Sequence, residues 1–342
     1  VELRISDRAA SLQPEFVVCV GDLVEGYTED KEVMARQCAE FDSLVGALEM
    51  PFFYVPGNHD LANEAMASDW RQRRGRPFYH LVYQDVLFLF LDTEDPPAGS
   101  GHLGPQQIEY VRAALADSPT VRWTMVFLHK PLWLSTVGET GWAQVEALLD
   151  GRPHTVVAGH HHRYMKERRN GADYFVLATT GGGSSLRGPL FGEFDHVVWV
   201  TMTESGPRLA NLMLDGIWDD SIRTAETAAL VDAVVAGASV SVEPVFVEDS
   251  VFTQGSTRLA LRNGASVPME LTCDVVPGQA LILEPAAVQA VLPPDSAQYV
   301  PLQVRARQAE LVVDQLPCAE LAWRARVELG DGRPFEFDGR SL

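Results

Sequence analysis

The spacing of apolar residues changes along the chain at about residue 215. Before that point, short apolar runs typical of strands alternate with segments in which apolar residues recur every three or four positions, as Val33, Phe41 and Leu44 do. This mixture predicts sheets covered by helices. The expected strands are 16–20, 52–55, 86–91, 123–128, 155–158, 174–178 and 196–202, and the expected helices are 2–12, 29–48, 105–115 and 142–149.

After residue 215, a helix expected at 221–236 is followed only by short β-rich runs separated by Gly, Pro and Asn. Several short strands at such spacing predict an antiparallel β-sandwich of the immunoglobulin-like (Ig-like) type. We therefore expect a first domain at 1–215, a linker with a helix at 216–238 and a β-sandwich accessory domain at 239–342. The expected strands of the sandwich are 240–247, 257–262, 268–276, 280–284, 297–305, 321–328 and 334–337.

Composition narrows the class of protein. A chain of 342 residues has room for two domains, and its formal net charge of -20 argues against a broad nucleic-acid surface, which needs clustered cations. No apolar run approaches the ~20 residues that span a membrane. Four cysteines make no disulfide framework, and a Cys273–Cys318 pairing stays open. The oligomeric state and the compartment also stay open, although the β-rich tail is compatible with an extracytoplasmic location.

Chemically active side chains directly follow four of the expected strands. In open α/β sheets, ligands bind beyond the carboxyl ends of the strands, so these side chains are expected to meet at one edge. Taken one at a time, each motif can be explained without a ligand, either as a turn or as a hydrogen-bonded histidine of the core. Together they predict a metal site. The motifs are Gly21-Asp22, Gly57-Asn58-His59-Asp60, His129 and Gly159-His160-His161-His162.

In this order the motifs resemble those of the calcineurin-like metallophosphoesterase family, whose pattern is DxH, GD, GNH(D/E), a lone His and GHxH. The resemblance covers roughly residues 1–215 and implies a four-layer α/β/β/α sandwich. It also implies two divalent ions, of Mn, Fe or Zn, that clamp a phosphoryl group. The implied ligands are Asp22 as the bridge, Asn58, His129 and His160 on one ion, and His162 on the other.

The remaining residues of the motifs receive different roles by the same resemblance. His59 would hydrogen-bond a phosphate oxygen or protonate the leaving group, and Asp60 would orient its imidazole. A glycine-rich loop at 179–184 resembles the loop that borders the site in this family, although a flexible turn explains it equally well. We expect Gly182 and Gly183 of this loop, and Arg187 just beyond it, to contact substrate. Asp195-His196 reads as a surface pair at the start of a strand, with a place behind the metal ligands as the alternative. Asp92 ends a strand and is expected near the site or behind its ligands.

The sequence departs from the family pattern because the opening DxH is absent. Asp7 is the nearest candidate, but Arg8-Ala9 follow it, and too few residues separate it from Asp22 for a strand and a crossover helix. We therefore expect residues 2–12 to be the end of that helix and the first strand to lie upstream of residue 1. Without that strand, only one ion would bind well and activity would be low.

The leading hypothesis is a metal-dependent hydrolase of small phosphomonoesters or phosphodiesters, in which a metal-bound hydroxide attacks phosphorus with the help of His59. The alternative is a catalytically impaired interaction protein that binds metal and phosphate. A nuclease is a third reading, which the acidic balance disfavours. The loops at 61–80 and 93–104, which would select the substrate, carry no recognisable signature.

Overall fold

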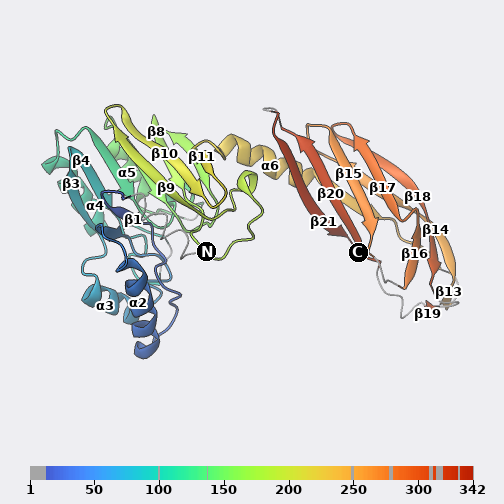
Figure 1. Ribbon diagram of the computed structural model, residues 1–342, viewed down its shortest axis with the longest axis horizontal. Helices are drawn as coiled ribbons and strands as arrows, with labels where there is room; N and C mark the ends of the chain where they lie inside the picture. The colour runs from blue at the N-terminus through green and yellow to red at the C-terminus, as the bar shows by residue number, and fades with distance from the viewer. Residues whose placement is uncertain are drawn as a thin grey trace. The chain divides into compact units, whose positions relative to one another are not determined.

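The computed structural model describes residues 13–98, 101–136, 138–247, 250–276, 280–307, 311–312, 319–329 and 332–341. The chain divides into two compact units, Val1–Ala225 and Glu226–Leu342 (Figure 1). The helix expected at 2–12, and with it the inference about the crossover helix, lies outside the described residues. Cys318 does too, so the pairing with Cys273 is not described.

A six-stranded sheet forms the centre of the first unit. Its four inner strands are parallel, and one antiparallel strand closes each edge. Strand β4 is buried along its whole length, as expected of a strand covered on both faces. The order across the sheet is β3 (Tyr79–Tyr83), β4 (Val86–Phe90), β5 (Trp123–Phe127), β6 (His154–Ala158), β8 (Ala172–Val176) and β7 (Met165–Arg169).

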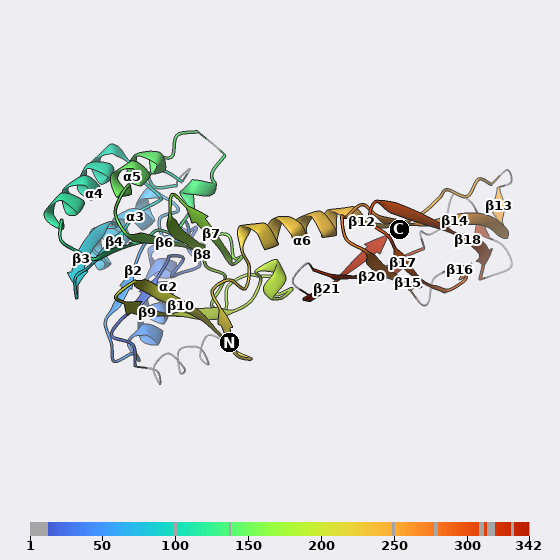
Figure 2. The same ribbon diagram turned by 90° about the horizontal axis from the view of Figure 1, so that it is seen from above.

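Alternate residues of this sheet face two different layers. Leu87 and Leu89 of β4 pack with helices α4 (Pro105–Asp117) and α5 (Trp142–Leu149). Phe88 and Phe90 point to the opposite side, where they pack with apolar residues of a second group of strands. Figure 2 shows α4 and α5 on one side of the sheet and strands β9 and β10 on the other. Because successive side chains of β4 point to opposite faces of the sheet, they pack into two different hydrophobic cores.

The second layer contains a parallel pair, β1 (Val17–Cys19) with β2 (Phe52–Tyr54), and an antiparallel sheet of β9 (His196–Thr203), β10 (Gly206–Met213) and β11 (Ile217–Asp219). Helices α2 (Lys31–Val45) and α3 (Glu64–Arg73) cover its β1–β2 part. Phe41 of α2 lies 5.9 Å from Phe52, and Trp70 of α3 lies 5.6 Å from Tyr54, measured between ring centroids. The first unit is thus an α/β/β/α arrangement, to which two short 3-10 helices, Leu132–Leu134 and Pro189–Phe191, are added.

The second unit begins with helix α6 (Ala225–Gly237) and continues as antiparallel strands. One sheet has the order β12 (Ala238–Val242), β14 (Gln254–Asn263), β18 (Ser296–Ala306) and β16 (Leu281–Glu284). The other has the order β17 (Ala287–Leu292), β15 (Met269–Val275), β20 (Leu321–Glu328) and β21 (Pro334–Ser341). A further pair joins β13 (Val251–Phe252) and β19 (Leu311–Val312).

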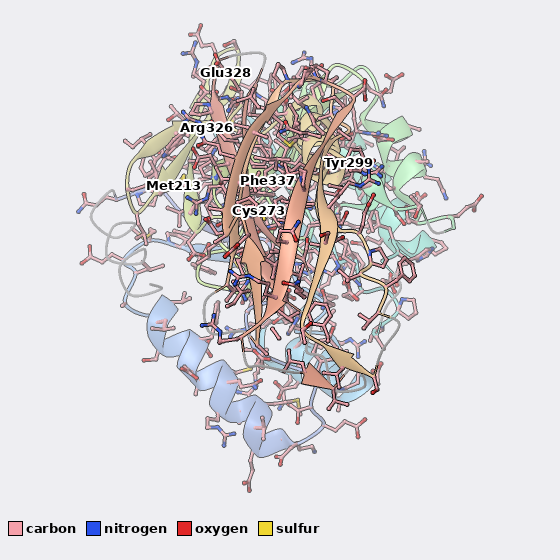
Figure 3. All side chains as sticks on the ribbon, turned by 90° about the vertical axis from the view of Figure 1, so that its right-hand side faces the viewer. Met213, Cys273, Tyr299, Arg326, Glu328 and Phe337 are labelled. Carbon is pink, nitrogen blue, oxygen red and sulfur yellow. The ribbon has the colours of Figure 1, made fainter. Side chains whose placement is uncertain are left out.

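Burial alternates along the strands of this second unit. On β20, Ala325 and Val327 are buried, whereas Arg326 and Glu328 are exposed. Figure 3 labels the last two residues together with Phe337, a buried residue of the neighbouring strand β21. Each sheet therefore has one apolar and one polar face, which confirms the expected β-rich C-terminal region. Among the described residues, no helix is both long and apolar enough to cross a membrane.

Candidate metal centre

The four loops that follow β1, β2, β5 and β6 bring their side chains to one place. Asp22 follows β1, Asn58 follows β2, His129 follows β5 and His160 follows β6. One ligand atom from each of Asp22, His129 and His160 lies within 4.8 Å of the other two. The amide of Asn58 reaches the same group, because its Oδ1 is 2.9 Å from His129 Nε2. The carboxyl ends of strands in both sheets thus supply the site.

The ring nitrogen His129 Nε2 lies at the centre of this group. It is 3.1 Å from His160 Nδ1 and 3.3 Å from Asp22 Oδ2. The other ring nitrogen, Nδ1, lies 2.8 Å from the carbonyl oxygen of Val20. A carbonyl can only accept, so Nδ1 carries a proton, and in the neutral tautomer this leaves the lone pair on Nε2. The lone pairs of two imidazoles, an amide oxygen and a carboxylate oxygen therefore face one another.

A divalent cation fits this donor set. Four electron-rich atoms at such distances repel one another unless a positive charge lies between them, and imidazole with carboxylate or amide oxygen is a common ligand combination for Zn, Mn and Fe. The hydrogen bond from His129 to Val20 is also the kind of outer contact that fixes the tautomer of a metal-binding histidine.

The protonation of two ligands suits such an ion. Burial lowers the pKa of His160 to about 3, so its imidazole is neutral near pH 7. Burial of Asp22 acts to raise its pKa, but hydrogen bonds to its carboxylate, among them the one from the backbone N–H of His59, outweigh that effect and the pKa falls below the ordinary value. Asp22 is therefore an anion at neutral pH.

Backbone strain is concentrated in the same loops. Asp22 has a φ of 58°, His160 of 69° and His162 of 52°, all in the left-handed region that non-glycine residues rarely adopt. Each such residue costs on the order of 1–3 kcal/mol, and such strain clusters at functional sites. The cost indicates that these loops are shaped for a ligand rather than for stability alone.

Comparison with known proteins agrees with the motif pattern and the geometry. Residues 3–164 match the family model for calcineurin-like phosphoesterase. This match covers slightly less than half of the chain. Two similar curated proteins are 3',5'-cyclic adenosine monophosphate phosphodiesterase CpdA of Escherichia coli strain K12, 26% identical over 174 residues, and serine/threonine-protein phosphatase CPPED1 of Bos taurus, 25% identical over 215 residues.

These alignments cover part of each protein. The first spans 48% of this chain and 61% of the relative, and the second spans 53% and 65%. The chain thus spans less than two thirds of the length of these curated relatives. Among solved structures, a dimetal phosphatase of Danio rerio is 14% identical, with a TM-score of 0.43 over 62% of this chain and 82% of that one. The purple acid phosphatase PPD1 of Lupinus luteus is 15% identical, with a TM-score of 0.48 over 66% and 50%.

His162, the remaining expected ligand in the first unit, is not in the group formed by Asp22, His129 and His160. Its Nδ1 lies 2.5 Å from the carbonyl oxygen of Gly183 in the glycine-rich loop. The carbonyl accepts the proton of Nδ1, which leaves the lone pair of Nε2 available. The glycine-rich loop therefore orients His162 through its backbone, a contact that the sequence pattern did not reveal.

The expected pairing of Asp60 with His59 is not formed, and this corrects the sequence-based role of Asp60. The buried Asp60 carboxylate accepts hydrogen bonds from the backbone N–H groups of Gly57 at 2.8 Å and Leu23 at 3.0 Å. His59 Nδ1 instead lies 2.6 Å from the carbonyl oxygen of Glu25. Asp60 thus links the loop of Asp22 to the loop of Asn58, because its carboxylate accepts a hydrogen bond from a backbone N–H of each loop.

The other expected substrate contacts also have partners of their own. Arg187 forms a two-pronged ion pair with Glu193, at 2.6 and 2.8 Å, and its guanidinium lies over the ring of Phe191. Phosphate binding by Arg187 would therefore compete with this pair. Gly182 and Gly183 belong to the loop beside His162, and the structure shows no contact that assigns them to substrate.

Asp195-His196 is not a surface pair, because His196 is only 2% exposed. Its Nδ1 lies 2.9 Å from Asn211 Oδ1, and its Nε2 accepts from the backbone N–H of Ala178 at 3.1 Å. Burial lowers the pKa of His196 to about 4. Asp195 accepts from the Thr179 hydroxyl at 2.7 Å and from the Gly181 N–H at 2.8 Å. The two residues therefore support the start of the glycine-rich loop.

Asp92 lies in a buried polar group of its own. Its Oδ1 accepts from the backbone N–H of Glu94 at 2.8 Å, and its main chain bonds to the side chain of Gln107. Burial raises the pKa of Asp92 to about 7. Glu94, also buried, pairs with Lys130, the residue after the candidate ligand His129. Asp92 therefore belongs to a hydrogen-bonded group next to the metal ligands and is not one of the residues that converge on His129.

The raised pKa of Asp92 predicts a pH dependence of stability. Between its ordinary value of 3.8 and about 7, the folded protein binds this proton more tightly than the unfolded chain, so stability falls as pH rises through that window. At about 1.4 kcal/mol per pKa unit, the penalty reaches up to about 4 kcal/mol. In urea unfolding, Asp92→Asn should be more stable than wild type at pH 8 and should lose that advantage at pH 4. Asp85→Asn, in the exposed turn after β3, is the control; equal pH profiles of Asp92→Asn and wild type would contradict the assignment.

Proposed function

We propose that the first unit of the chain is a metal-dependent hydrolase of phosphate esters. The observation that carries the proposal is the convergence of Asp22, Asn58 and His160 on Nε2 of His129. The names of the relatives support the same bond type, because they include a cyclic nucleotide phosphodiesterase, a protein phosphatase and a probable glycerophosphodiester phosphodiesterase. Those named substrates differ, so the proposal extends to phosphomonoesters and phosphodiesters and no further.

Two ions are proposed for this centre. Asp22, Asn58, His129 and His160 would hold one, and His162 with Asp22 would contribute to the other. Mn, Fe and Zn all suit the nitrogen and oxygen donors. Bound ions of this kind polarise the phosphoryl group, acidify the attacking water and stabilise the charge that develops on the oxygens around phosphorus. The anionic Asp22 offsets part of their charge and can face both.

His59 is proposed to act on the substrate directly. Its Nδ1 donates to the carbonyl oxygen of Glu25, so the ring is fixed and Nε2 is the atom left for chemistry. A half-buried imidazole beside the ligand Asn58 can donate a hydrogen bond to a phosphoryl oxygen, or a proton to the departing oxygen, when Nε2 is protonated. The proposed role thus needs neither Asp60 nor direct contact with the metal.

Substitution of His59 should separate catalysis from metal binding. His59→Gln is expected to lower kcat by about 10²–10⁴, the usual contribution of a general acid or base, while metal content stays at the wild-type level. Steady-state kinetics together with elemental analysis measures both quantities. His80→Gln, whose ring contacts Tyr110 in the wild type, is the matched control and should keep the wild-type rate. A kcat for His59→Gln equal to that of the control would remove His59 from the mechanism.

The proposed activity is tested with p-nitrophenyl phosphate and bis(p-nitrophenyl) phosphate in the presence of Mn²⁺ or Zn²⁺. We expect release of nitrophenolate from at least one of them, loss of turnover with EDTA and recovery when metal is returned. Turnover that EDTA does not affect would contradict the proposal. Phosphate binding without any product would favour the interaction protein that the sequence left as the alternative.

We also propose that residues 239–342 form an Ig-like β-sandwich that follows a catalytic domain at 1–215 in the sequence, with a linker at 216–238 between them. Support comes from the two four-stranded antiparallel sheets with alternating burial and from the position of α6 in the linker region. Limited proteolysis should then cut within 216–238 and release a folded C-terminal fragment. Failure of that fragment to give a cooperative unfolding transition would contradict the division.

A further inference from the structure

The loop at 25–28 contacts the turn that carries Asn58 and His59 through three consecutive residues. The carbonyl oxygen of Glu25 lies 2.6 Å from His59 Nδ1. Gly26 packs so closely on this turn that a Cβ at its position would lie 1.8 Å from the carbonyl oxygen of His59. The third contact is a hydrogen bond from Asn58 Nδ2 to the phenol oxygen of Tyr27, at 2.7 Å. Three consecutive residues therefore contact the two site residues.

Two features of Tyr27 are unfavourable for the stability of the fold, and the surroundings of its side chain do not offset them. Its side chain is 63% exposed, so burial contributes little to the fold. Its φ of 48° lies in the left-handed region, which is unfavourable for a bulky residue. Its ordered contacts include Asn58 and the His59 ring, whose centroid is 4.8 Å away at an interplanar angle of 81°. Such strain is retained where it serves a functional site.

The contact with Tyr27 holds the end of the Asn58 amide that faces away from the metal site. Only the oxygen of an amide can bind a cation, and Asn58 Oδ1 is the atom that faces His129 Nε2, at 2.9 Å. In this orientation the amide NH₂ points the other way and needs an acceptor. The Tyr27 hydroxyl supplies that acceptor, so the amide is fixed at its NH₂ end while its oxygen faces the metal site.

The loop is also anchored firmly enough to act as a support. The backbone N–H of Gly26 donates to Gln37 Oε1 on α2 at 3.1 Å. The carbonyl oxygen of Thr28 accepts from Asn63 Nδ2 at 3.1 Å, and Asn63 itself caps the N-terminus of α3. Two helices thus hold the loop on either side of Tyr27, so the position of the phenol is set by the fold.

We propose that Tyr27 is a positioning residue that holds Asn58 Oδ1 toward the metal, an inference that rests on the proposed function. Outer contacts of metal ligands typically change metal affinity by 10–100-fold. Tyr27→Phe keeps the ring beside His59 and removes only the hydroxyl. We expect this variant to bind Mn²⁺ about tenfold more weakly than wild type, with an unchanged thermal unfolding midpoint of the metal-free protein.

The experiment is a double-mutant cycle on the full chain, with Mn²⁺ affinity measured by titration calorimetry. Wild type, Tyr27→Phe, Asn58→Ala and the double variant are compared, and Tyr83→Phe, which removes a surface phenol bonded to Gln84, is the control. If Tyr27 acts through Asn58, its substitution weakens binding in the wild type and has no further effect in the Asn58→Ala background. At saturating Mn²⁺, KM of Tyr27→Phe should stay at the wild-type value.

The outcomes separate the inference from the function on which it rests. Wild-type binding of Mn²⁺ with an unchanged affinity in Tyr27→Phe overturns the inference alone. An equal loss in the Asn58→Ala background, or a change confined to KM, also overturns it, because Tyr27 would then act on the metal site or the substrate independently of Asn58. Failure of the wild-type chain to bind Mn²⁺ overturns the proposed function and this inference with it.

Discussion

Asp22→Asn is expected to lower metal-dependent phosphoester hydrolysis by at least about 10³-fold while the protein stays folded. An ion held by this carboxylate supplies several kcal/mol of stabilisation to the reacting phosphoryl group, and each 1.4 kcal/mol or so is a factor of about ten in rate. The amide keeps the shape of the carboxylate but loses the charge. It would also place either an NH₂ or a neutral oxygen 3.3 Å from His129 Nε2, where the wild type has an anionic oxygen.

The fold should survive this change because the local hydrogen bond can be kept. Asp22 Oδ1 accepts from the backbone N–H of His59 at 3.1 Å, and an amide oxygen accepts equally well. Turnover at saturating Mn²⁺ and thermal unfolding are the two measurements, with the exposed Asp215→Asn as the control. A rate for Asp22→Asn within tenfold of wild type would show that this carboxylate does not hold the catalytic ion.

Gly57→Ala is the second change with a large expected effect, because it inserts one methyl group into the centre. A Cβ at Gly57 would lie 2.1 Å from Asp22 Oδ1 and 2.5 Å from the backbone nitrogen of Asp22, both far inside van der Waals contact. Either the Asp22 loop or the Asn58 turn must move. We expect weaker Mn²⁺ binding and a loss of about 1–3 kcal/mol in the free energy of unfolding, typical of overpacking.

Urea unfolding and Mn²⁺ titration of the same samples test this expectation. Gly216→Ala is the matched control, because Gly216 has no positive φ and its added Cβ would meet only Trp218 Nε1, at 3.7 Å. The control should resemble wild type in both measurements. If Gly57→Ala is as stable as Gly216→Ala and binds Mn²⁺ with wild-type affinity, the close approach of the two loops has no role in the centre.

The sequence predicted those elements best in which burial alone determines the pattern. The helix at 142–149 and the strand at 321–328 begin and end where the apolar periodicity placed them. Helix α3 was missed inside a segment expected to be a loop, because only Met66, Ala67 and Trp70 on it are buried. Strand β7, Met165–Arg169, was missed because it is a polar edge strand with no apolar alternation.

For the candidate site, the sequence predicted which residues converge but not which atoms pair. Asp22, Asn58, His129 and His160 could be found because each directly follows a strand, and strand ends share an edge. The actual partners of Asp60 and Arg187 depend on the paths of loops, which the spacing of residues does not encode. The same holds for Tyr27, whose only signals are an aromatic residue directly after Gly26 and its place shortly after the Gly21-Asp22 motif.

The most direct test of the account is the metal content of the purified chain. Wild type and Asp22→Asn are incubated separately with Mn²⁺ and with Zn²⁺, desalted and measured by elemental analysis against protein concentration. We expect at least one retained ion per wild-type chain with one of these metals, and a clear loss of that ion in Asp22→Asn. Wild-type protein that retains neither metal, or an equal content in both proteins, would contradict the central claim that these four residues form a metal centre.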